Sequence, residues 1–205
     1  MVKKKIQAIV NDRMYQNSFY LILNSIVLTG FGFFFWTIAA KLYTAHDVGL
    51  ASTILSAMNL IVLLSGLGLG MAIMRHLPTS KKKQEHISSS LMISVLVALA
   101  LSAVFVYLTR NYYVKLDFIQ RNLYYGIIFV LGTVFSVASG LLNSVFTAFR
   151  DSRYVLYQST LFSILKLIFP FFLVTFGAMG IFGSWVIAVV IGAPPSLRPA
   201  QEPSA

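Results

Sequence analysis

Lys166 is the residue whose type and position most strongly indicate chemistry, because it is the only charge deep inside an apolar segment, 156–176. An ammonium group facing lipid is costly, so we expect it to face a bundle interior or a water-filled cavity. Pro170 cannot donate a hydrogen bond to the Lys166 carbonyl, which predicts a helix break beside the charge. A cation beside a broken helix suits an anionic ligand. The alternative is that Lys166 snorkels along a tilted helix or bonds backbone carbonyls for packing alone.

Three arginines are the other candidates for contact with an anionic substrate. Arg150 and Arg153 fall at the predicted cytoplasmic mouth, and their forked guanidinium groups match phosphate oxygens. Arg75 ends the second apolar segment and is soon followed by three consecutive lysines, 81–83. Such basic clusters act mainly as topology determinants, which is the simpler interpretation of this one. The sequence therefore offers four candidate substrate-binding cations, of which Lys166 is the strongest.

Other chemistries find little support. The six Asp and Glu residues all fall outside the apolar segments, so no intramembrane carboxylate is available to couple transport to a proton or Na⁺. The three His residues lie at segment ends or in loops without metal-ligand spacing, and the chain has no cysteine. The sequence contains no nucleophile–base pair and no phosphate-binding glycine loop. We therefore predict no metal, no cofactor and no enzyme activity.

Small residues recur at regular spacing inside the apolar segments. In segment 122–148 they stand at every fourth position, a stripe that lets another helix approach closely: Gly132, Ser136, Gly140 and Ser144. Helix packing is the favoured interpretation of this stripe, and the alternative is that it lines a substrate path. Three glycines near the end of the second segment are either a packing surface, which we favour, or a flexible point: Gly66, Gly68 and Gly70.

Six apolar segments must position these residues. The 205-residue chain is 58% hydrophobic and only 11% charged, whereas soluble domains are roughly 25% charged. About 20 apolar residues cross a bilayer core, and the first five segments reach that length while the sixth is marginal. The segments are 18–42, 48–74, 88–108, 122–148, 156–176 and 178–192. We therefore predict an all-α, polytopic transmembrane helix bundle of about six spans, whose first two form an antiparallel hairpin.

The charge distribution predicts how this bundle is oriented. A formal net charge of +10 would suit nucleic acid, but the Lys and Arg residues lie between apolar runs rather than on one folded face. Placing the N-terminus in the cytoplasm puts eleven of them inside and four outside, which matches the positive-inside bias. The first apolar run is too long for a cleaved signal peptide, so we expect it to stay as a signal anchor.

The chain divides into three regions. Residues 1–16 form a basic leader, either an amphipathic helix on the cytoplasmic leaflet or a disordered segment. Residues 17–192 form the transmembrane bundle. Residues 193–205 hold four of the six prolines and are predicted to be disordered. The abrupt change at the end of the sixth segment suggests a truncated or frameshifted terminus.

Several short stretches in the first hairpin form a combination typical of a known family. They follow Asn17 and Asn24 and read FWTIAAKLY at 35–43, DVGLAS at 47–52, SGLGL at 65–69 and RHLP at 75–78. This combination resembles the opening hairpin of oligosaccharide flippases. These are the polysaccharide-biosynthesis exporters of the multidrug/oligosaccharidyl-lipid/polysaccharide, MATE-like superfamily. The match is strongest over 17–78 and continues more loosely, as span order and loop lengths, to about residue 190.

The resemblance implies a plasma-membrane transporter built from two six-helix lobes around a cavity that opens alternately to each face. Its implied substrate is a polyprenyl-pyrophosphate-linked oligosaccharide, moved from the inner to the outer leaflet for surface polysaccharide assembly. The four candidate cations would then meet the diphosphate: Lys166, Arg75, Arg150 and Arg153. The chain corresponds to the N-terminal lobe only, so a second lobe or a homodimer would be needed to complete the cavity.

Two alternatives remain open from the sequence. A drug or cation antiporter of the same superfamily would require membrane carboxylates, which these segments lack. A truncated, non-transporting membrane protein is compatible with the chain length and the proline-rich tail.

Overall fold

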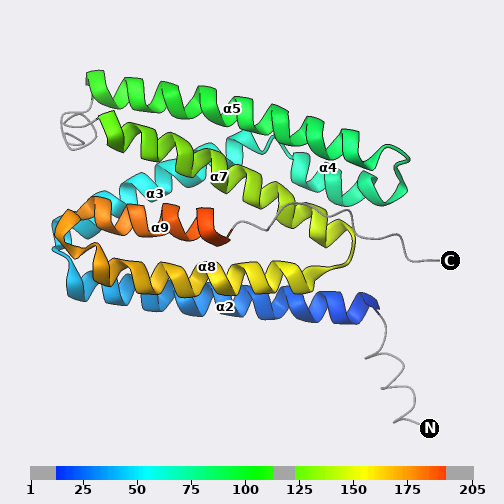
Figure 1. The fold of residues 1–205 in the computed structure, drawn as a ribbon, viewed down its shortest axis with the longest axis horizontal. Coiled ribbons are helices and arrows are strands. Elements are labelled where there is room, and N and C mark those ends of the chain that lie inside the picture. Colours follow the sequence, from blue (N-terminus) through cyan, green and yellow to red (C-terminus); the bar gives the residue numbers. More distant parts are fainter. Residues whose placement is uncertain (1–12, 113–122, 193–205) are drawn as a thin grey trace, which may run out of the picture.

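The structure, a computed structural model, describes residues 13–112 and 123–192, and within these ranges it contains helices and connecting turns but no strand (Figure 1). The predicted tail, 193–205, and most of the predicted leader, 1–16, lie outside these ranges. The elements are α2 (Arg13–Leu42), α3 (Ala45–Ser65), α4 (Leu69–His76), η1 (Leu77–Thr79), α5 (Lys83–Tyr112), α7 (Leu123–Ala148), α8 (Ser152–Phe172), η3 (Val174–Phe176) and α9 (Ala178–Gly192). The all-α prediction is confirmed.

Five of the described helices are long and apolar enough to cross a membrane. Their spans are Tyr15–Leu42, Ala45–Ser65, Lys83–Thr109, Tyr124–Ala148 and Ser152–Phe172. The sixth predicted segment forms α9, which at 15 residues is shorter than the roughly 20 that cross a hydrocarbon core. Large apolar side chains cover the outside of the bundle, an arrangement suited to lipid rather than water.

The second predicted segment, 48–74, is not one helix. It divides into α3 and α4 at a turn where two residues have left-handed backbone conformations, Leu67 at φ 46° and Gly68 at φ 71°. Glycine adopts this conformation readily, whereas for leucine it carries a steric cost. Packing was the favoured interpretation of this glycine-rich stretch. It does not hold at Gly68, which is the N-cap of α4 and has no atom within 4 Å of an added Cβ, whereas an added Cβ at Gly70 would lie 2.8 Å from a side chain of α7, as packing predicts.

Helices α2 and α8 lie side by side and run in the same direction (Figure 1). At one end, the Asn17 side-chain oxygen accepts a hydrogen bond from the Ser152 backbone N–H, at 3.2 Å. At the other end, the Tyr43 hydroxyl donates to the Pro170 carbonyl, at 2.8 Å. Consecutive spans alternate in direction, so the first and fifth membrane-length helices are expected to be parallel.

The remaining helices pack around α7. Helix α5 runs antiparallel to α7, since Lys83 at its start lies over the Phe149 ring while Phe105 near its end stacks on Phe129, with ring centroids 4.9 Å apart. Helices α3 and α9 fill the space between the α2–α8 pair and the α5–α7 pair (Figure 1). The central core joins α3, α7 and α9. Its residues are Ile54, Leu55, Met58, Ile61, Phe129, Met179, Phe182 and Val186.

Candidate functional site

Lys166 is buried in the interior of the bundle, with 4% of its surface exposed. Its ammonium nitrogen lies 5.0 Å from the ring centroid of Phe35, 5.2 Å from that of Phe162 and 4.8 Å from that of Trp185. All three distances are within the range of about 6 Å in which an aromatic face attracts a cation. We call Phe35, Phe162 and Trp185 the ring cage.

Three helices supply the ring cage. Phe162 precedes Lys166 by one turn of α8, so both side chains share one helix face. Phe35 comes from the parallel helix α2, and Trp185 comes from α9. The Trp185 ring meets those of Phe35 and Phe162 edge to face, at centroid distances of 6.4 and 5.2 Å. Such contacts are favourable, so the rings fix one another as well as the ammonium.

The charge of Lys166 has no counterion within residues 13–112 and 123–192, where it forms neither an ion pair nor a hydrogen bond. Aromatic faces attract the charge, but they offer no oxygen acceptor to the three N–H groups of an ammonium. The same ranges contain no group of three His, Asp or Glu residues that could hold a metal ion. The site therefore has an unused capacity for an anionic partner.

The buried face of α8 is unusually polar for a membrane helix. One row of side chains points into the bundle, and we call Ser152, Gln158, Ser159 and Ser163 the polar row. The Gln158 amide nitrogen donates to the Ser139 hydroxyl of α7 at 2.7 Å. The Gln158 amide oxygen and the Ser163 hydroxyl are buried and have no hydrogen-bond partner in the part of the chain that the structure describes. The polar row extends from the start of α8 to the turn before Lys166 and is interrupted by Val155, which is also buried.

The position of Lys166 along α8 differs from expectation. The helix continues through Pro170 and ends at Phe172, so the predicted break lies two residues later, after the proline. At about 1.5 Å per residue, Lys166 is about 21 Å from the start of α8 and about 9 Å from its end. Because the helix starts and ends earlier than segment 156–176, the charge lies towards the predicted outer side rather than at mid-depth.

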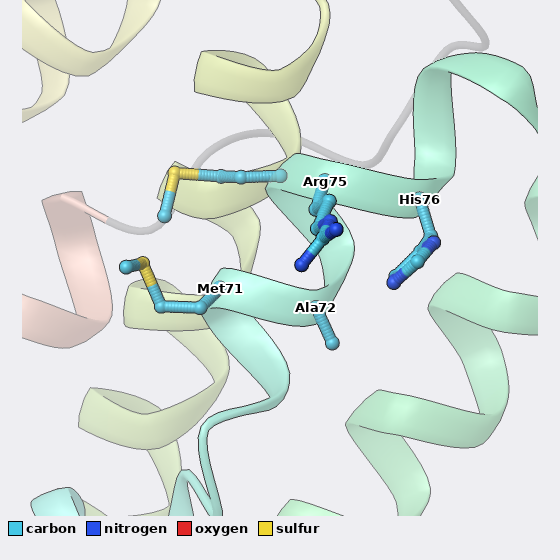
Figure 2. Close-up of a pocket in the computed structure, with 5 residues that line it drawn as sticks. Met71, Ala72, Arg75 and His76 are labelled. Carbon is cyan, nitrogen blue, oxygen red and sulfur yellow. The ribbon is translucent and has the colours of Figure 1, made fainter.

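Arg75 lies on α4, at the opposite end of the bundle from the ring cage. It is exposed and lines a hollow of about 560 Å³ together with Met71, Ala72, Met74 and His76. Figure 2 shows the side chains of Arg75 and His76 projecting to the same side of α4. The hollow combines a cation with flexible apolar side chains on a single short helix, which is a suitable surface for an amphipathic anion.

Arg150 and Arg153 lie where α7 passes into α8. Arg150 is exposed in the turn, at φ 60°. Arg153 is also exposed; it donates to the Gln16 side-chain oxygen at 3.1 Å, and its guanidinium carbon lies 5.4 Å from the Tyr20 ring centroid. The rise of α8 separates Arg153 from Lys166 by about 20 Å. The structure therefore does not gather the four candidate cations into one cluster.

The small-residue stripe of α7 contacts other helices at its two ends. A Cβ added to Gly132 would lie 2.6 Å from a valine side chain of α9. A Cβ added to Gly70 of α4 would lie 2.8 Å from the Ser144 hydroxyl. Between them, Gly140 is exposed with no atom within 4 Å of an added Cβ, and Ser136 bonds the carbonyl of Gly132 within α7 at 2.7 Å.

Comparison with known families covers nearly the whole of this bundle. A family model described as polysaccharide biosynthesis protein matches residues 14–194. The chain belongs to this family. No curated protein and no solved structure matches it. The family and the five membrane-length helices together make this polysaccharide biosynthesis protein a multi-pass membrane protein of the exporter type.

The ring cage of this polysaccharide biosynthesis protein is absent from the sequence-based interpretation. The proximity of Phe162 could have been predicted from the sequence, because a residue one helical turn from Lys166 must share its face of the helix. The polar row could also have been predicted from the sequence, since most of its members recur at helical spacing along one face. Phe35 and Trp185 had no such signal, because their proximity depends on which helices pack together.

Proposed function

We propose that this protein is a transporter, or the N-terminal lobe of one, that flips a polyprenyl-pyrophosphate-linked oligosaccharide across the plasma membrane for surface polysaccharide assembly. The observation that carries the proposal is a membrane-buried ammonium with no counterion among the described residues, in a chain that matches the polysaccharide biosynthesis protein family. A pyrophosphate headgroup would supply the missing negative charge and the oxygen acceptors. The protein then acts by binding and moving its substrate, without enzymatic chemistry.

The positions of the cations support a sequence of contacts. Arg75, Arg150 and Arg153 are exposed near one end of the bundle, which the charge bias predicts to be cytoplasmic. Lys166 lies about 20 Å further along α8, a substantial part of the roughly 30 Å hydrocarbon core. In this proposal the arginines attract the headgroup at the inner leaflet and Lys166 receives it deeper in the bundle, while the polyprenyl chain stays in lipid.

A closed translocation path needs more protein than these helices provide. The polar sugars and the pyrophosphate of the substrate must be screened from lipid on all sides while they cross the bilayer. We therefore propose that a second lobe, or a second copy of this chain, packs against the bundle to complete the cavity.

The test is substitution of Lys166 in cells whose surface polysaccharide depends on this protein. Lys166→Glu replaces attraction of the headgroup by repulsion, and Lys166→Ala removes the attraction, so both should abolish surface polymer while membrane insertion persists. Lys166→Arg keeps the charge and should retain part of the export. The matched control is Lys41→Glu, the same charge change at an exposed position at the end of α2. Wild-type amounts of surface polymer from Lys166→Glu would disprove the role of Lys166 in transport.

A further inference from the structure

The ring cage joins three helices through one ammonium group. We propose that it is a latch: Lys166 in the cage holds α2 and α9 against α8, and an anionic headgroup that reaches the ammonium draws it out of the rings and releases Trp185. This inference rests on the proposed function, because it assigns a regulatory step to the same lysine. In this inference the ring cage is the part of the site that responds when the substrate headgroup binds Lys166.

The chemistry of the cage favours such an exchange. Each ring attracts the positive charge, but none of them satisfies the hydrogen-bonding capacity of the ammonium, which has three N–H donors. Phosphate oxygens accept charge-assisted hydrogen bonds and also neutralise the charge. The ammonium is therefore held well enough to order three helices, while a phosphate-bearing ligand can compete for it. A carboxylate partner inside the protein would already neutralise the ammonium and accept its hydrogen bonds, so a phosphate would gain little by competing for it.

The polar row gives the headgroup a route to the latch. It occupies the buried face of α8 from Ser152 to the turn before Lys166, interrupted by Val155, and its polar groups make this face less unfavourable to a phosphate group than an apolar face would be. One of its members has an unused hydrogen-bonding group: the Ser163 hydroxyl lies one turn from Lys166 and has no partner among the described side chains and backbone. The row thus connects the arginines of the predicted cytoplasmic end with the buried ammonium.

The effect of release is expected at the Trp185 side chain rather than as a movement of a whole helix. Helix α2 is also held by the hydrogen bonds of Asn17 and Tyr43, and α9 is also held by the Asp47–Ala178 hydrogen bond and by its residues in the central core. Trp185 lies in the middle of α9 and contacts α8 through Phe162, a member of the cage. Withdrawal of Lys166 removes the cation that this pair of rings shares, so Trp185 becomes the reporter of the latch.

The experiment uses the two tryptophans of the chain, Trp36 and Trp185. Trp36→Phe leaves Trp185 as the only tryptophan, and the purified full chain is studied in dodecyl maltoside. Dodecyl phosphate, a phosphate on an apolar chain, is titrated in, and inorganic pyrophosphate is tested in parallel to separate a lipid-borne from a free phosphate. We expect dodecyl phosphate to raise the acrylamide quenching constant of Trp185 about twofold, as a shift to a largely open population predicts. Lys166→Met in the same background keeps an unbranched side chain without the charge and should not respond.

Two results would overturn the latch: no change in Trp185 quenching of folded protein with either phosphate, or an equal change in Lys166→Met. If Lys166→Met does not fold, Phe162→Leu replaces it as the test variant. Because this substitution removes one ring, it should raise the quenching constant before any phosphate is added, and an unchanged constant would also refute the latch. If Trp185 of the folded protein responds to dodecyl phosphate but the protein does not support export of surface polymer in cells, the proposed function alone is contradicted. Normal export without the response would contradict the latch alone.

Discussion

The side-chain carboxylate of Asp47 accepts a hydrogen bond from the backbone N–H of Ala178, at 3.2 Å, although the two residues are 131 positions apart. Asp47 also accepts the Thr44 hydroxyl at 2.7 Å, and its own N–H donates back to that hydroxyl oxygen at 3.1 Å. One carboxylate therefore stabilises the first turn of α3 and the first N–H of α9. It ties the α2–α3 turn to the α8–α9 turn at the predicted outer end.

Replacing Asp47 should loosen this end of the bundle. Asp47→Ala removes both acceptor contacts, while Thr44 still caps α3, and the loss of the side-chain acceptor for the first N–H of α9 costs about 1–2 kcal/mol. Asp47→Asn is the matched control, because it keeps one oxygen acceptor for the Ala178 N–H and loses the second acceptor together with the charge favourable at a helix N-terminus. Thermal melting in detergent should rank the proteins wild type, Asp47→Asn, Asp47→Ala. A melting temperature of Asp47→Ala equal to that of wild type would contradict the tie.

Tyr43 should make the same end sensitive to alkaline pH. Burial, and to a smaller extent the nearby Asp47 carboxylate, raise the pKa of the Tyr43 phenol above its ordinary value. The folded state then holds the phenol proton more tightly than the unfolded chain does. This stabilisation is complete below about pH 10 and is lost as the pH rises from there through the higher pKa of the folded state.

Tyr43→Phe isolates this effect. It should cost about 1 kcal/mol at neutral pH, because the Pro170 carbonyl loses its donor, and it should flatten the decline in stability above about pH 10. The measurement is the melting temperature of both proteins between neutral and strongly alkaline pH. An identical alkaline decline in wild type and Tyr43→Phe would assign the sensitivity to another group.

Gly132 and Gly140 form a matched pair on one helix. Gly132→Ala places a methyl group against the valine of α9 and should destabilise the protein by roughly 1–3 kcal/mol through overpacking. Gly140→Ala meets nothing within 4 Å and should be neutral or stabilising by up to about 1 kcal/mol, since alanine favours helix. Melting temperatures of the two variants decide between packing and an open surface, and a reversed order would refute the contact between α7 and α9.

Lys166→Met should stabilise the protein while removing its transport function. Burial of a charge that has no counterion among the described residues is costly, so an apolar side chain of similar length that still contacts the rings should be neutral or stabilising. We therefore expect a higher melting temperature for Lys166→Met than for wild type, together with loss of surface polymer. A strong decrease in melting temperature would instead show that the attraction between the ammonium and the three rings outweighs the cost of burying its charge.

The predicted orientation can be tested directly because the chain has no cysteine. Lys41 and Lys83 are exposed residues at opposite ends of the bundle, in the last turn of α2 and at the start of α5. In intact cells, a membrane-impermeant maleimide should label Lys41→Cys, whereas Lys83→Cys should react only after permeabilisation. The opposite pattern would invert the topology and exchange the two ends in the proposed sequence of contacts.

The sequence was sufficient to predict where the helices lie along the chain, but not which helices pack against one another. Five predicted segments agree with single helices to within about five residues at each end, because membrane-length apolar runs leave little freedom. The break at Leu67 was not predicted, because a left-handed leucine is unfavourable and depends on tertiary context. Burial of Lys166 could be expected from its charge alone, whereas its cage could not.

The reason lies in how helices associate in lipid. Around α2 apolar residues occur on every side, so periodicity does not identify the side that meets α8. In water the hydrophobic side would mark the contact, but lipid tails are as apolar as leucine and remove that signal. The position of Phe35 beside Lys166 follows from that pairing and therefore needed coordinates.

The pairing of α2 with α8 also has a consequence for biosynthesis. Asn17 and its partner Ser152 are separated by 135 residues, so at about 5–20 residues per second the ribosome needs on the order of 10 s to deliver the second helix after the first. During that interval α2 lies in the bilayer without its main partner α8, a state that the apolar residues on every side of α2 tolerate. Trp185 lies on α9, which is made after α8, so the cage around the lysine can form only once this later helix has joined the α2–α8 pair.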